Sequence, residues 1–375
     1  MKHCAGSDPP PALAHLREEL AALEADGLLR LPASPPAGLS FCSNDYLGLA
    51  SRTVAAGAPV GSGASRLVAG DCREHVALEK ALSGWLGTSD AIVFTSGYAA
   101  NVGLLAALSG PHDLIVSDAL NHASIIDGAR LSRARVEIVP HADAGAVERA
   151  LRGRPERRAW VVTESYFSMD ADQPDLARLR RICDTEGAAL LVDEAHAIGV
   201  FGPSGRGLCA AAGIVPDALV GTFGKALGGG GAFVTGCSDL RLWLWNRARS
   251  FVFSTGLSPA VAAANREAVE RLRADASLRE TVAARAAQLR AGLRRLGVEP
   301  LGFGHVVPWV LGDARAAVQM ARLLAERGVF VQPIRPPSVP MGTARLRFTV
   351  TAAHSEADVA AALAAVEDSI RCSAG

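Results

Sequence analysis

The sequence lacks the features that mark nucleic-acid-binding, membrane-spanning and secreted proteins. Its 38 Lys and Arg residues balance 38 Asp and Glu residues, so the chain has no basic excess for binding a nucleic acid. No apolar run reaches the roughly 18 residues that a membrane-spanning helix needs. The N-terminus also lacks the charged start and apolar core of a signal peptide. We therefore expect an ordinary globular protein of the cytoplasm that binds neither nucleic acid nor membranes.

Cysteine is sparse and scattered along the chain. The seven cysteines include no Cys-x-x-Cys pair; they are residues 4, 42, 72, 183, 209, 237 and 372. An odd number of isolated cysteines in a large chain predicts neither a disulfide framework nor a structural zinc site. We expect them to act as small apolar side chains in a reducing compartment.

Apolar sequence, by contrast, is abundant. Hydrophobic residues make up 49% of the 375, which is enough to bury a large core and to form more than one domain. From about residue 90 to 236, apolar β-branched runs alternate with helical segments, a pattern that predicts a mostly parallel sheet covered on both faces. A long helical region follows at about 258–297. Beyond it, strands, among them VFVQPI, and helices alternate in a different order, which indicates a smaller α+β unit.

The predicted fold class is therefore α/β, with a large mostly parallel-sheet domain and a smaller C-terminal α+β domain. We place the large domain at residues 46–260 and the small domain at 261–375. Residues 1–45 combine a short amphipathic helix, LAHLREELAALEADG, with a proline-rich connector, LPASPPAG. This segment is expected to be an N-terminal arm.

Polar residues follow several of the predicted strands at the point where each strand ends. In an open parallel sheet, ligands bind outside the carboxyl ends of the strands, so these side chains form one candidate site. The set consists of Ser96, Gly97, Tyr98, Asn121, His122, Glu164, Ser168, Asp193, His196, Thr222 and Lys225.

The stretch VFTSGYAAN places Ser96 and Gly97 between a strand and a helix. Backbone N–H groups and the helix dipole can hold a phosphate at such a junction. Because any strand, turn and helix would look similar, an ordinary turn remains the alternative for this stretch taken alone.

The stretch LLVDEAHAIG ends a buried strand with Asp193 and places His196 three residues later. A buried carboxylate is costly unless it is paired, and a protonated ring nitrogen would be a suitable partner. A helix cap or a metal site are the alternatives. With a single Asp-x-x-His and no further His or Cys nearby, we predict no metal.

The stretch TFGKALGGGG places Lys225 between two core strands and ahead of four glycines. Most lysines extend their side chain to the surface, but this position favours a buried amine. Glycine leaves room where a bulky ligand approaches the chain, and burial lowers a lysine's pKa, as an amine that forms a Schiff base requires. A phosphate anchor, an acidic partner for a ring nitrogen and an imine-forming lysine together indicate pyridoxal phosphate.

Long stretches of the sequence resemble the α-oxoamine synthases, fold-type-I pyridoxal-phosphate enzymes that condense an amino acid with an acyl-CoA and release CO2. The resemblance covers residues 41 to about 359 and follows the family's order. It is carried by SNDYLGL, GSGASRLVAGDCREHVALEKALSGWLG, TSGYAANVG, NHASIIDGARLS, ESYFSMDAD, VDEAHAIGVFGPSGRG, TFGKALG and IRPPSVPMGTARLRFTVTAAHSE. The glycine run after Lys225 is richer than the family's pattern, and the N-terminal arm matches poorly.

The resemblance implies a role for each catalytic candidate. Lys225 resembles the lysine that forms the Schiff base with the cofactor and then removes the Cα proton of the substrate. Asp193 resembles the residue that keeps the pyridine nitrogen protonated, and His122 the histidine stacked on the ring. His196 matches the histidine near the phenolic oxygen of the cofactor, and Ser168 resembles a further polar contact.

The remaining candidates are contacts of the phosphate and the substrates. Gly97, Tyr98 and Thr222 are the best matches for phosphate contacts, beside Ser96, and Thr255 in FSTGLSP is expected to reach the phosphate of a second subunit. Arg345 in GTARLR resembles the arginine that binds the substrate carboxylate, a task suited to a guanidinium. Asn44, Glu164 and Arg30 are weaker candidates for the same site.

The C-terminal stretch IRPPSVPMGTARLRFTVTAAH resembles the family members that use L-alanine with pimeloyl-CoA or a pimeloyl carrier-protein thioester. Glycine C-acetyltransferase and 5-aminolevulinate synthase activities remain alternatives, since one methyl group changes binding by only about 1–3 kcal/mol. The family also implies a homodimer with its sites at the subunit interface.

Two other classes fit less well. A nicotinamide dehydrogenase needs a glycine fingerprint after its first strand, and both GSGASR and GGGGAF fail at the sixth position. A non-catalytic pyridoxal-phosphate domain of a transcription regulator would need an attached DNA-binding module. The roughly 40 residues before SNDYLGL are too few and too weakly basic to form one.

Overall fold

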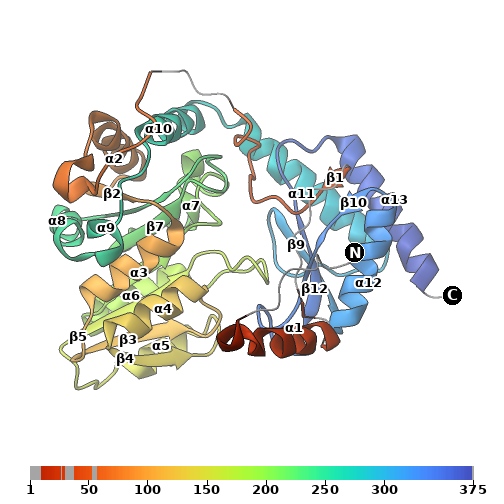
Figure 1. Cartoon of the computed structure of the whole chain (residues 1–375), viewed down its shortest axis with the longest axis horizontal. Helices are drawn as coiled ribbons and strands as arrows, with labels where there is room; N and C mark the ends of the chain where they lie inside the picture. The colour runs from red at the N-terminus through yellow and green to blue at the C-terminus, as the bar shows by residue number, and fades with distance from the viewer. Residues whose placement is uncertain (1–9, 27, 30–37, 53–56, 374–375) are drawn as a thin grey trace.

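A computed structural model describes residues 10–26, 28–29, 38–52 and 57–373. Figure 1 shows two bodies side by side, a larger one that contains β2 (Asp90–Phe94) to α10 (Pro259–Ala274) and a smaller one that contains the C-terminal end of the chain. This arrangement agrees with the predicted pair of a large and a small domain. The exact limits at residues 45 and 260 stay a prediction.

The larger body is built on a seven-stranded sheet with the order β2-β8-β7-β6-β5-β3-β4. Six strands run parallel and β8 alone runs antiparallel to both of its neighbours, so the predicted mostly parallel α/β sheet is confirmed. The strands are β2 (Asp90–Phe94), β3 (Asp113–Asp118), β4 (Arg135–Val139), β5 (Arg158–Glu164), β6 (Ala189–Asp193), β7 (Ala218–Thr222) and β8 (Ala232–Gly236).

Helices cover both faces of this sheet, as fully apolar strands require. One face packs against α3 (Gly97–Leu108), α4 (Ala123–Ser132), α8 (Ser238–Arg247) and α9 (Arg249–Val252). The other face packs against α2 (Arg73–Leu86), α5 (Ala144–Leu151), α6 (Leu176–Glu186), α7 (Gly207–Ala211) and α10 (Pro259–Ala274). The carboxyl ends of the parallel strands therefore stay open for a ligand.

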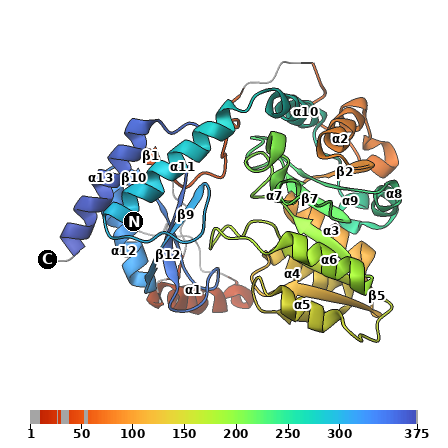
Figure 2. The ribbon, with the colours of Figure 1, turned by 180° about the vertical axis from the view of Figure 1, so that it is seen from behind.

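The smaller body contains a three-stranded antiparallel sheet with the order β11-β12-β9. Its strands are β9 (Val306–Gly312), β11 (Gln332–Ile334) and β12 (Ala344–Thr349), and its helices are α11 (Ser277–Arg295), α12 (Ala314–Glu326) and α13 (Glu356–Ser373). Figure 2 shows the same two bodies from behind. The stretch VFVQPI, predicted as one strand, divides into β10 (Val329–Phe330) and β11.

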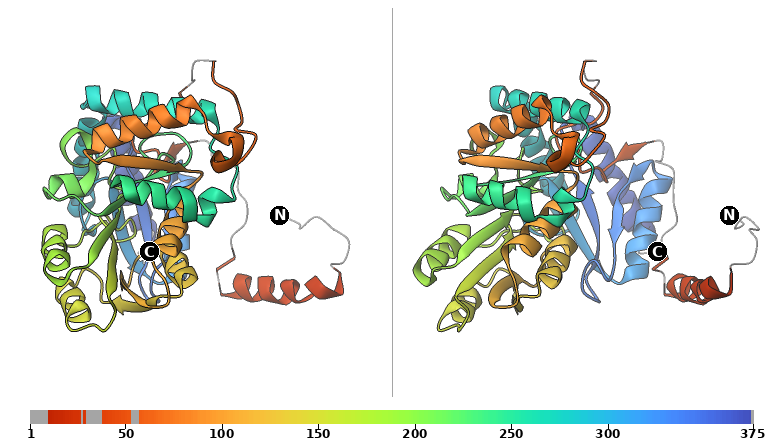
Figure 3. Two further views of the ribbon diagram at one scale, coloured as in Figure 1. Left: turned by 90° about the vertical axis from the view of Figure 1, so that its left-hand side faces the viewer. Right: turned by 60° about the vertical axis from the view of Figure 1, so that its left-hand side comes forward.

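The predicted N-terminal arm has two different parts. Helix α1 (His15–Ala25) stands apart from both bodies, and none of its side chains is buried against the described residues (Figure 3). In contrast, β1 (Leu39–Ser40) pairs in parallel with β10, and Phe41 is fully buried in the core of the smaller body. The end of the predicted arm thus joins the small body.

Within the described part of the chain, none of the helices is both long and apolar enough to cross a bilayer. The six cysteines described there are all free. The cytoplasmic location stays a prediction.

Candidate active site

Lys225 lies in the nine-residue loop, 223–231, that joins β7 to β8. The antiparallel direction of β8 follows from this connection, because a return to a parallel strand needs a crossover of a dozen or more residues. The loop starts at the carboxyl end of β7, where ligands of parallel sheets bind. A short hairpin therefore places the lysine at the expected edge of the sheet.

Three of the four glycines at 228–231, which follow Lys225, pack closely against other parts of the chain. A Cβ on Gly228 would lie 2.4 Å from the backbone carbon of Leu49, and one on Gly229 would lie 1.9 Å from the Asn265 side-chain oxygen. Gly228 and Gly231 also have φ angles of +60° and +89°, a region that disfavours other residues. At these positions glycine is required by the protein's own packing. The sequence had instead suggested that the glycines leave room for a ligand.

A cavity of about 210 Å³ surrounds the Lys225 side chain. It brings together eight of the predicted site residues, which come from the ends of five different strands or the helices after them. Its lining consists of Gly97, Tyr98, Asn101, His122, Ser124, Glu164, Asp193, Ala195, His196, Val220, Gly221, Thr222 and Lys225.

A chain of hydrogen bonds starts at Lys225. Its Nζ lies 2.7 Å from His196 Nε2, and His196 Nδ1 lies 2.6 Å from the Tyr46 hydroxyl. Tyr46 in turn donates to Asn44 Oδ1 at 3.3 Å. One assignment of donors is consistent with all of these hydrogen bonds: Lys225 donates to His196 Nε2, and His196 Nδ1–H donates to the Tyr46 oxygen. Burial lowers the pKa of His196 well below its usual range, which agrees with the neutral ring that this chain requires.

The charge of Lys225 is also set by burial. Desolvation lowers its pKa to about 8, although the carboxyl groups of Asp193 and Glu164 oppose the shift. The neutral amine is therefore available at mildly alkaline pH. This is the protonation state that a nucleophile or a general base needs.

Asp193 is held with both carboxylate oxygens fixed. Asn101 donates from Nδ2 to Oδ2 at 2.7 Å, and the Ala195 backbone N–H donates to Oδ1 at 2.8 Å. Glu164 lies directly beside Asp193 in the register of β5 and β6. Desolvation, followed by repulsion from Asp193, raises the pKa of Glu164 to about 8. At neutral pH the site thus has one neutral carboxyl group beside the hydrogen-bonded Asp193.

His122 precedes α4 and is fixed by the first turn of that helix. Its Nδ1 accepts from the Ser124 backbone N–H at 3.2 Å and lies 2.7 Å from the Ser124 hydroxyl. Burial lowers the pKa of His122. The ring is therefore a neutral, oriented wall of the cavity.

The opposite end of the cavity is formed by the start of α3. Ser96 caps the helix by accepting from the Ala99 N–H at 3.1 Å, and the N–H groups of Gly97 and Tyr98 precede the first intrahelical hydrogen bond. A Cβ on Gly97 would point toward Thr222, 3.9 Å from its Oγ1. Gly97 and Thr222 thus face one another, as expected for two contacts of one anion.

The two arginines of β12 have different partners, and these partners do not favour the role that the sequence predicted for Arg345. Arg345 Nη1 donates to Asp170 Oδ1 and to the Met169 carbonyl, each at 2.7 Å, so its charge is already paired. Arg347 donates to the Ser168 carbonyl at 2.9 Å and to Asn44 Oδ1 at 3.1 Å. Arg347 therefore joins the hydrogen-bond chain from Lys225, whereas the predicted carboxylate-binding Arg345 is engaged by the neighbouring loop.

The other predicted residues lie elsewhere. The described residues lining the cavity do not include Ser96, Ser168 or Asn44. Ser96 precedes Gly97 of the lining, the Ser168 carbonyl accepts from Arg347, and Asn44 belongs to the hydrogen-bond chain from Lys225. Thr255 is exposed in the loop after α9, so its predicted contact with a second subunit stays a prediction. Arg30 lies outside the described residues.

Four residues of the site were missed by the sequence interpretation: Tyr46, Asn101, Ser124 and Arg347. Asn101 is one helical turn after Gly97, and Ser124 belongs to the quoted stretch NHAS, so both could have been found from spacing. Tyr46 is in SNDYLGL. Arg347 and Arg345 are two residues apart and lie on the same face of a strand, so the sequence could not show which of them binds the carboxylate.

Among the described residues, no cluster of three or more His, Cys, Asp or Glu side chains could hold a metal ion.

Comparisons with known proteins agree with this geometry. Residues 36–366 match the family described as aminotransferase class I and II. The chain is 48% identical to 8-amino-7-oxononanoate synthase from Anaeromyxobacter sp. (strain Fw109-5), over 95% of this chain and 96% of that protein. Among solved structures, it resembles Sphingomonas wittichii serine palmitoyltransferase with a TM-score of 0.89 and 30% identity, over 98% of this chain and 99% of that one.

A second solved structure carries the cofactor. It is a lysine-to-alanine variant of serine palmitoyltransferase from S. paucimobilis with bound PLP–myriocin aldimine. The TM-score is 0.88 and the identity 27%, over 96% of this chain and 98% of that one. The chain therefore belongs to the aminotransferase class I and II family and, within it, to the 8-amino-7-oxononanoate synthases.

Proposed function

We propose that this chain condenses L-alanine with pimeloyl-CoA, or with a pimeloyl carrier-protein thioester, to give 8-amino-7-oxononanoate, CO2 and the free thiol. Its cofactor is pyridoxal phosphate, and its pathway is biotin biosynthesis. Membership of the family supports the overall reaction. The single observation that carries the assignment to this cavity is the partly buried Lys225 amine, which lies 2.7 Å from His196 and shares its cavity with Asp193 and His122.

The residues of the cavity fit the cofactor. Lys225 would hold it covalently through Nζ, and Asp193 would accept the hydrogen bond of its ring nitrogen. His122 would lie against the ring. The N-terminus of α3, with Gly97 and Thr222, supplies N–H donors and a hydroxyl for the phosphate, and the missing Cβ of Gly97 leaves room there.

Bound pyridoxal phosphate supplies an acceptor for the electrons left on the substrate carbon when its proton or carboxyl group is removed. The chain's residues act around that chemistry. Lys225, with its pKa near 8, can accept the Cα proton at Nζ. The paired contacts of Asn101 and Ala195 keep both oxygens of Asp193 oriented toward the cavity. Because His196 is neutral, its Nε2 accepts a hydrogen bond from Lys225 and the ring does not repel the charge of the lysine.

We propose Arg347, and not Arg345, as the residue that binds the substrate carboxylate. Arg347 is joined through Asn44 and Tyr46 to the hydrogen bonds of His196 and Lys225. Arg345 already forms an ion pair with Asp170. A guanidinium whose hydrogen bonds to the protein go to one carbonyl and one amide oxygen keeps its charge available for an incoming carboxylate.

We also propose that the protein is a homodimer in which Thr255 approaches the partner's cofactor phosphate. Phe253 is 73% exposed and Val68 is 79% exposed. Their elements lie together, because the Gly256 N–H donates to the Ala64 carbonyl at 3.0 Å. Large apolar side chains gathered on a surface are typical of an interface.

The proposed function is tested by thiol release from purified protein with pyridoxal phosphate. L-Alanine, glycine and L-serine would be crossed with pimeloyl-, acetyl- and succinyl-CoA. We expect release with L-alanine and pimeloyl-CoA to exceed every other pair. Preferred use of glycine with acetyl- or succinyl-CoA would instead identify a glycine C-acetyltransferase or a 5-aminolevulinate synthase. No release from any pair, despite bound cofactor, would contradict an acyltransferase function.

A further inference from the structure

A histidine outside the cavity bridges two carboxylates on different segments. His141 Nδ1 lies 2.9 Å from Asp118 Oδ1, at the end of β3, and His141 Nε2 lies 3.1 Å from Asp172 Oδ2. A ring can donate from both nitrogens only when it is protonated. The hydrogen bonds that His141 donates to Asp118 and, to a smaller extent, to Asp172 raise the pKa of His141 to about 10. His141 is therefore a cation at neutral pH, held between two anions.

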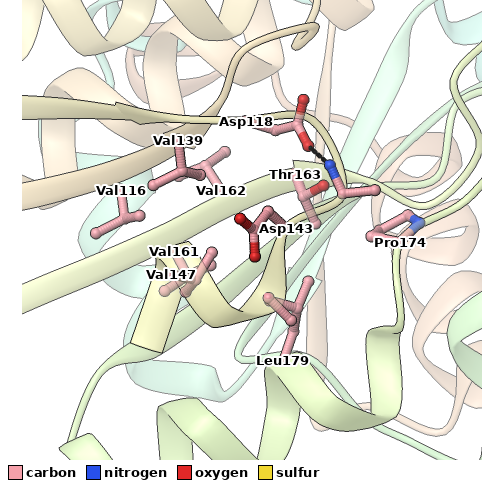
Figure 4. Close-up of a pocket in the computed structure, with 12 residues that line it drawn as sticks. Val116, Asp118, Val139, Asp143, Val147, Val161, Val162, Thr163, Pro174 and Leu179 are labelled. Carbon is pink, nitrogen blue, oxygen red and sulfur yellow. Dashed lines mark hydrogen bonds between the residues drawn. The ribbon is translucent and has the colours of Figure 1, made fainter. Parts of the chain in front are cut away.

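One of these carboxylates is itself rigidly held. Asp118 accepts from the backbone N–H of Ala142 at 2.8 Å and from that of Leu120 at 2.8 Å, so both of its oxygens are fixed by the chain. Figure 4 shows Asp118 beside the valine side chains that line a small cavity. Asp118 therefore holds the Nδ1 side of the His141 ring in a fixed position.

The other carboxylate belongs to a tight turn. Phe167 and Asp172 form an antiparallel bridge, and the Ala171 N–H donates to the Phe167 carbonyl at 2.7 Å. The His141 ring packs edge-on against Phe167, with 4.5 Å between the ring centres. We call residues 167–172 the bridging turn. His141 contacts it at both ends, through the charge of Asp172 and the ring of Phe167.

The bridging turn also contacts the smaller body. Figures 1 and 2 show a yellow-green loop that extends from the large body toward β12. Within the turn, the carbonyl of Ser168 accepts from Arg347, and Met169 and Asp170 accept from Arg345. Two of these three acceptors are backbone carbonyls. Their position depends on how the turn is anchored and not on the side chains that it carries.

We propose that His141 is a positioning residue for substrate binding, which fixes the bridging turn so that the Ser168 carbonyl orients Arg347 toward the cavity. The inference rests on the proposed role of Arg347. The path runs from Asp118 through His141 to Asp172, and from the turn to Arg347, without touching the cofactor cavity. Loss of His141 would release one end of the turn and let the Ser168 carbonyl move, while Lys225 and Asp193 keep their own contacts.

The test compares His141→Gln with wild type and with His112→Gln, a control at an exposed histidine in the turn before β3. The direct readout is the dissociation constant of L-alanine for the protein loaded with pyridoxal phosphate, from calorimetry. The second readout is the KM for L-alanine and for pimeloyl-CoA. We expect the alanine dissociation constant and KM to rise roughly tenfold in His141→Gln. The KM for the thioester and the affinity for pyridoxal phosphate should stay within about twofold, and His112→Gln should match wild type.

Asp172→Asn provides a second route should His141→Gln fold poorly, because it removes the other half of the same contact. We expect the same selective rise, and a double variant that is no worse than either single one, since both changes break one link. Equal alanine affinity in wild type and in these variants, or a fall in thermal stability without a change in alanine affinity, would overturn the positioning role alone. Failure of the wild-type protein to bind alanine would instead contradict the proposed function, and the role of His141 with it.

Discussion

The amine of Lys225 is neutral at a lower pH than most lysines, because burial brings its pKa from 10.5 to about 8. Only the neutral amine attacks a carbonyl carbon. We predict that the rate at which cofactor-free protein takes up pyridoxal phosphate rises through about pH 8 and then levels off. Stopped-flow absorbance across a pH series measures this rate. A rate that keeps rising toward pH 10 would show that the amine is not desolvated as described.

Glu164 gives a prediction for stability. Its pKa in the folded protein is raised from 4.5 to about 8, so the folded state holds a proton that the unfolded chain loses earlier. Stability from this group is present below about pH 4.5 and is lost as the pH rises toward 8. Glu164→Gln, which cannot ionise, should therefore gain stability relative to wild type as the pH rises across this window. Thermal unfolding of the cofactor-free wild type and variant at pH 5 and pH 8 tests this prediction. An equal difference in stability between the two proteins at both pH values would contradict the raised pKa of Glu164.

The two arginines of β12 predict different effects for the same conservative change. Lysine cannot reproduce the two-pronged guanidinium contact with a carboxylate. Arg347→Lys should raise the KM for L-alanine by about tenfold or more, because one good charge-assisted contact contributes roughly 1.5–3 kcal/mol. Arg345→Lys, at the ion pair with Asp170, should have a smaller effect on that KM. Steady-state kinetics decides between them, and the reverse order would restore Arg345 as the carboxylate-binding residue.

At the scale of elements, the loop between β7 and β8 depends on its glycines. Gly228 has a φ of +60°, and a Cβ there would meet the Leu49 backbone, which cannot move aside as a flexible side chain could. Gly228→Ala should lower the free energy of unfolding by about 1–3 kcal/mol. At Gly230, an added Cβ would meet only Val261 Cγ1, at 3.4 Å. Gly230→Ala is therefore the matched control, expected within about 0.5 kcal/mol of wild type in urea unfolding. Equal losses in the two variants would contradict this explanation.

The elements themselves could largely be predicted from the sequence, because uninterrupted β-branched runs between helical segments leave few alternatives to a covered parallel sheet. The direction of β8 was also accessible from the sequence, because the nine residues between β7 and β8 are too few for a parallel crossover, but it was not inferred. The break in VFVQPI was hidden, because its two halves pair with different strands: β10 pairs with β1, which is distant in the sequence, and β11 pairs with β12.

The candidate site was predictable where residues follow strands, which brought Lys225, Asp193 and His122 to one cavity. The resemblance to the family supplied their roles. The choice between Arg345 and Arg347 was not predictable, because both project from the same face of β12 and only the position of the bridging turn separates them. Tyr46 was missed because its partner His196 is 150 residues away.

At the scale of the whole molecule, we predict a dimer that depends on the exposed apolar surface near α9. Multi-angle light scattering of the cofactor-bound protein should give twice the chain mass of 38.8 kDa. Phe253→Glu, which places a charge on that surface, should shift the mass toward one chain. It should also weaken cofactor binding if Thr255 reaches the partner's phosphate. A wild-type monomer with full activity would contradict the proposed assembly.

The most direct test of the account is to identify the product by mass spectrometry. Purified protein with pyridoxal phosphate would receive pimeloyl-CoA and L-alanine labelled with ¹³C at the methyl carbon, beside a second reaction labelled at the carboxyl carbon. The account predicts 8-amino-7-oxononanoate that keeps the methyl label and loses the carboxyl label as CO2, and no product from Lys225→Ala. Thiol release without this product, or an undiminished yield from Lys225→Ala, would contradict it.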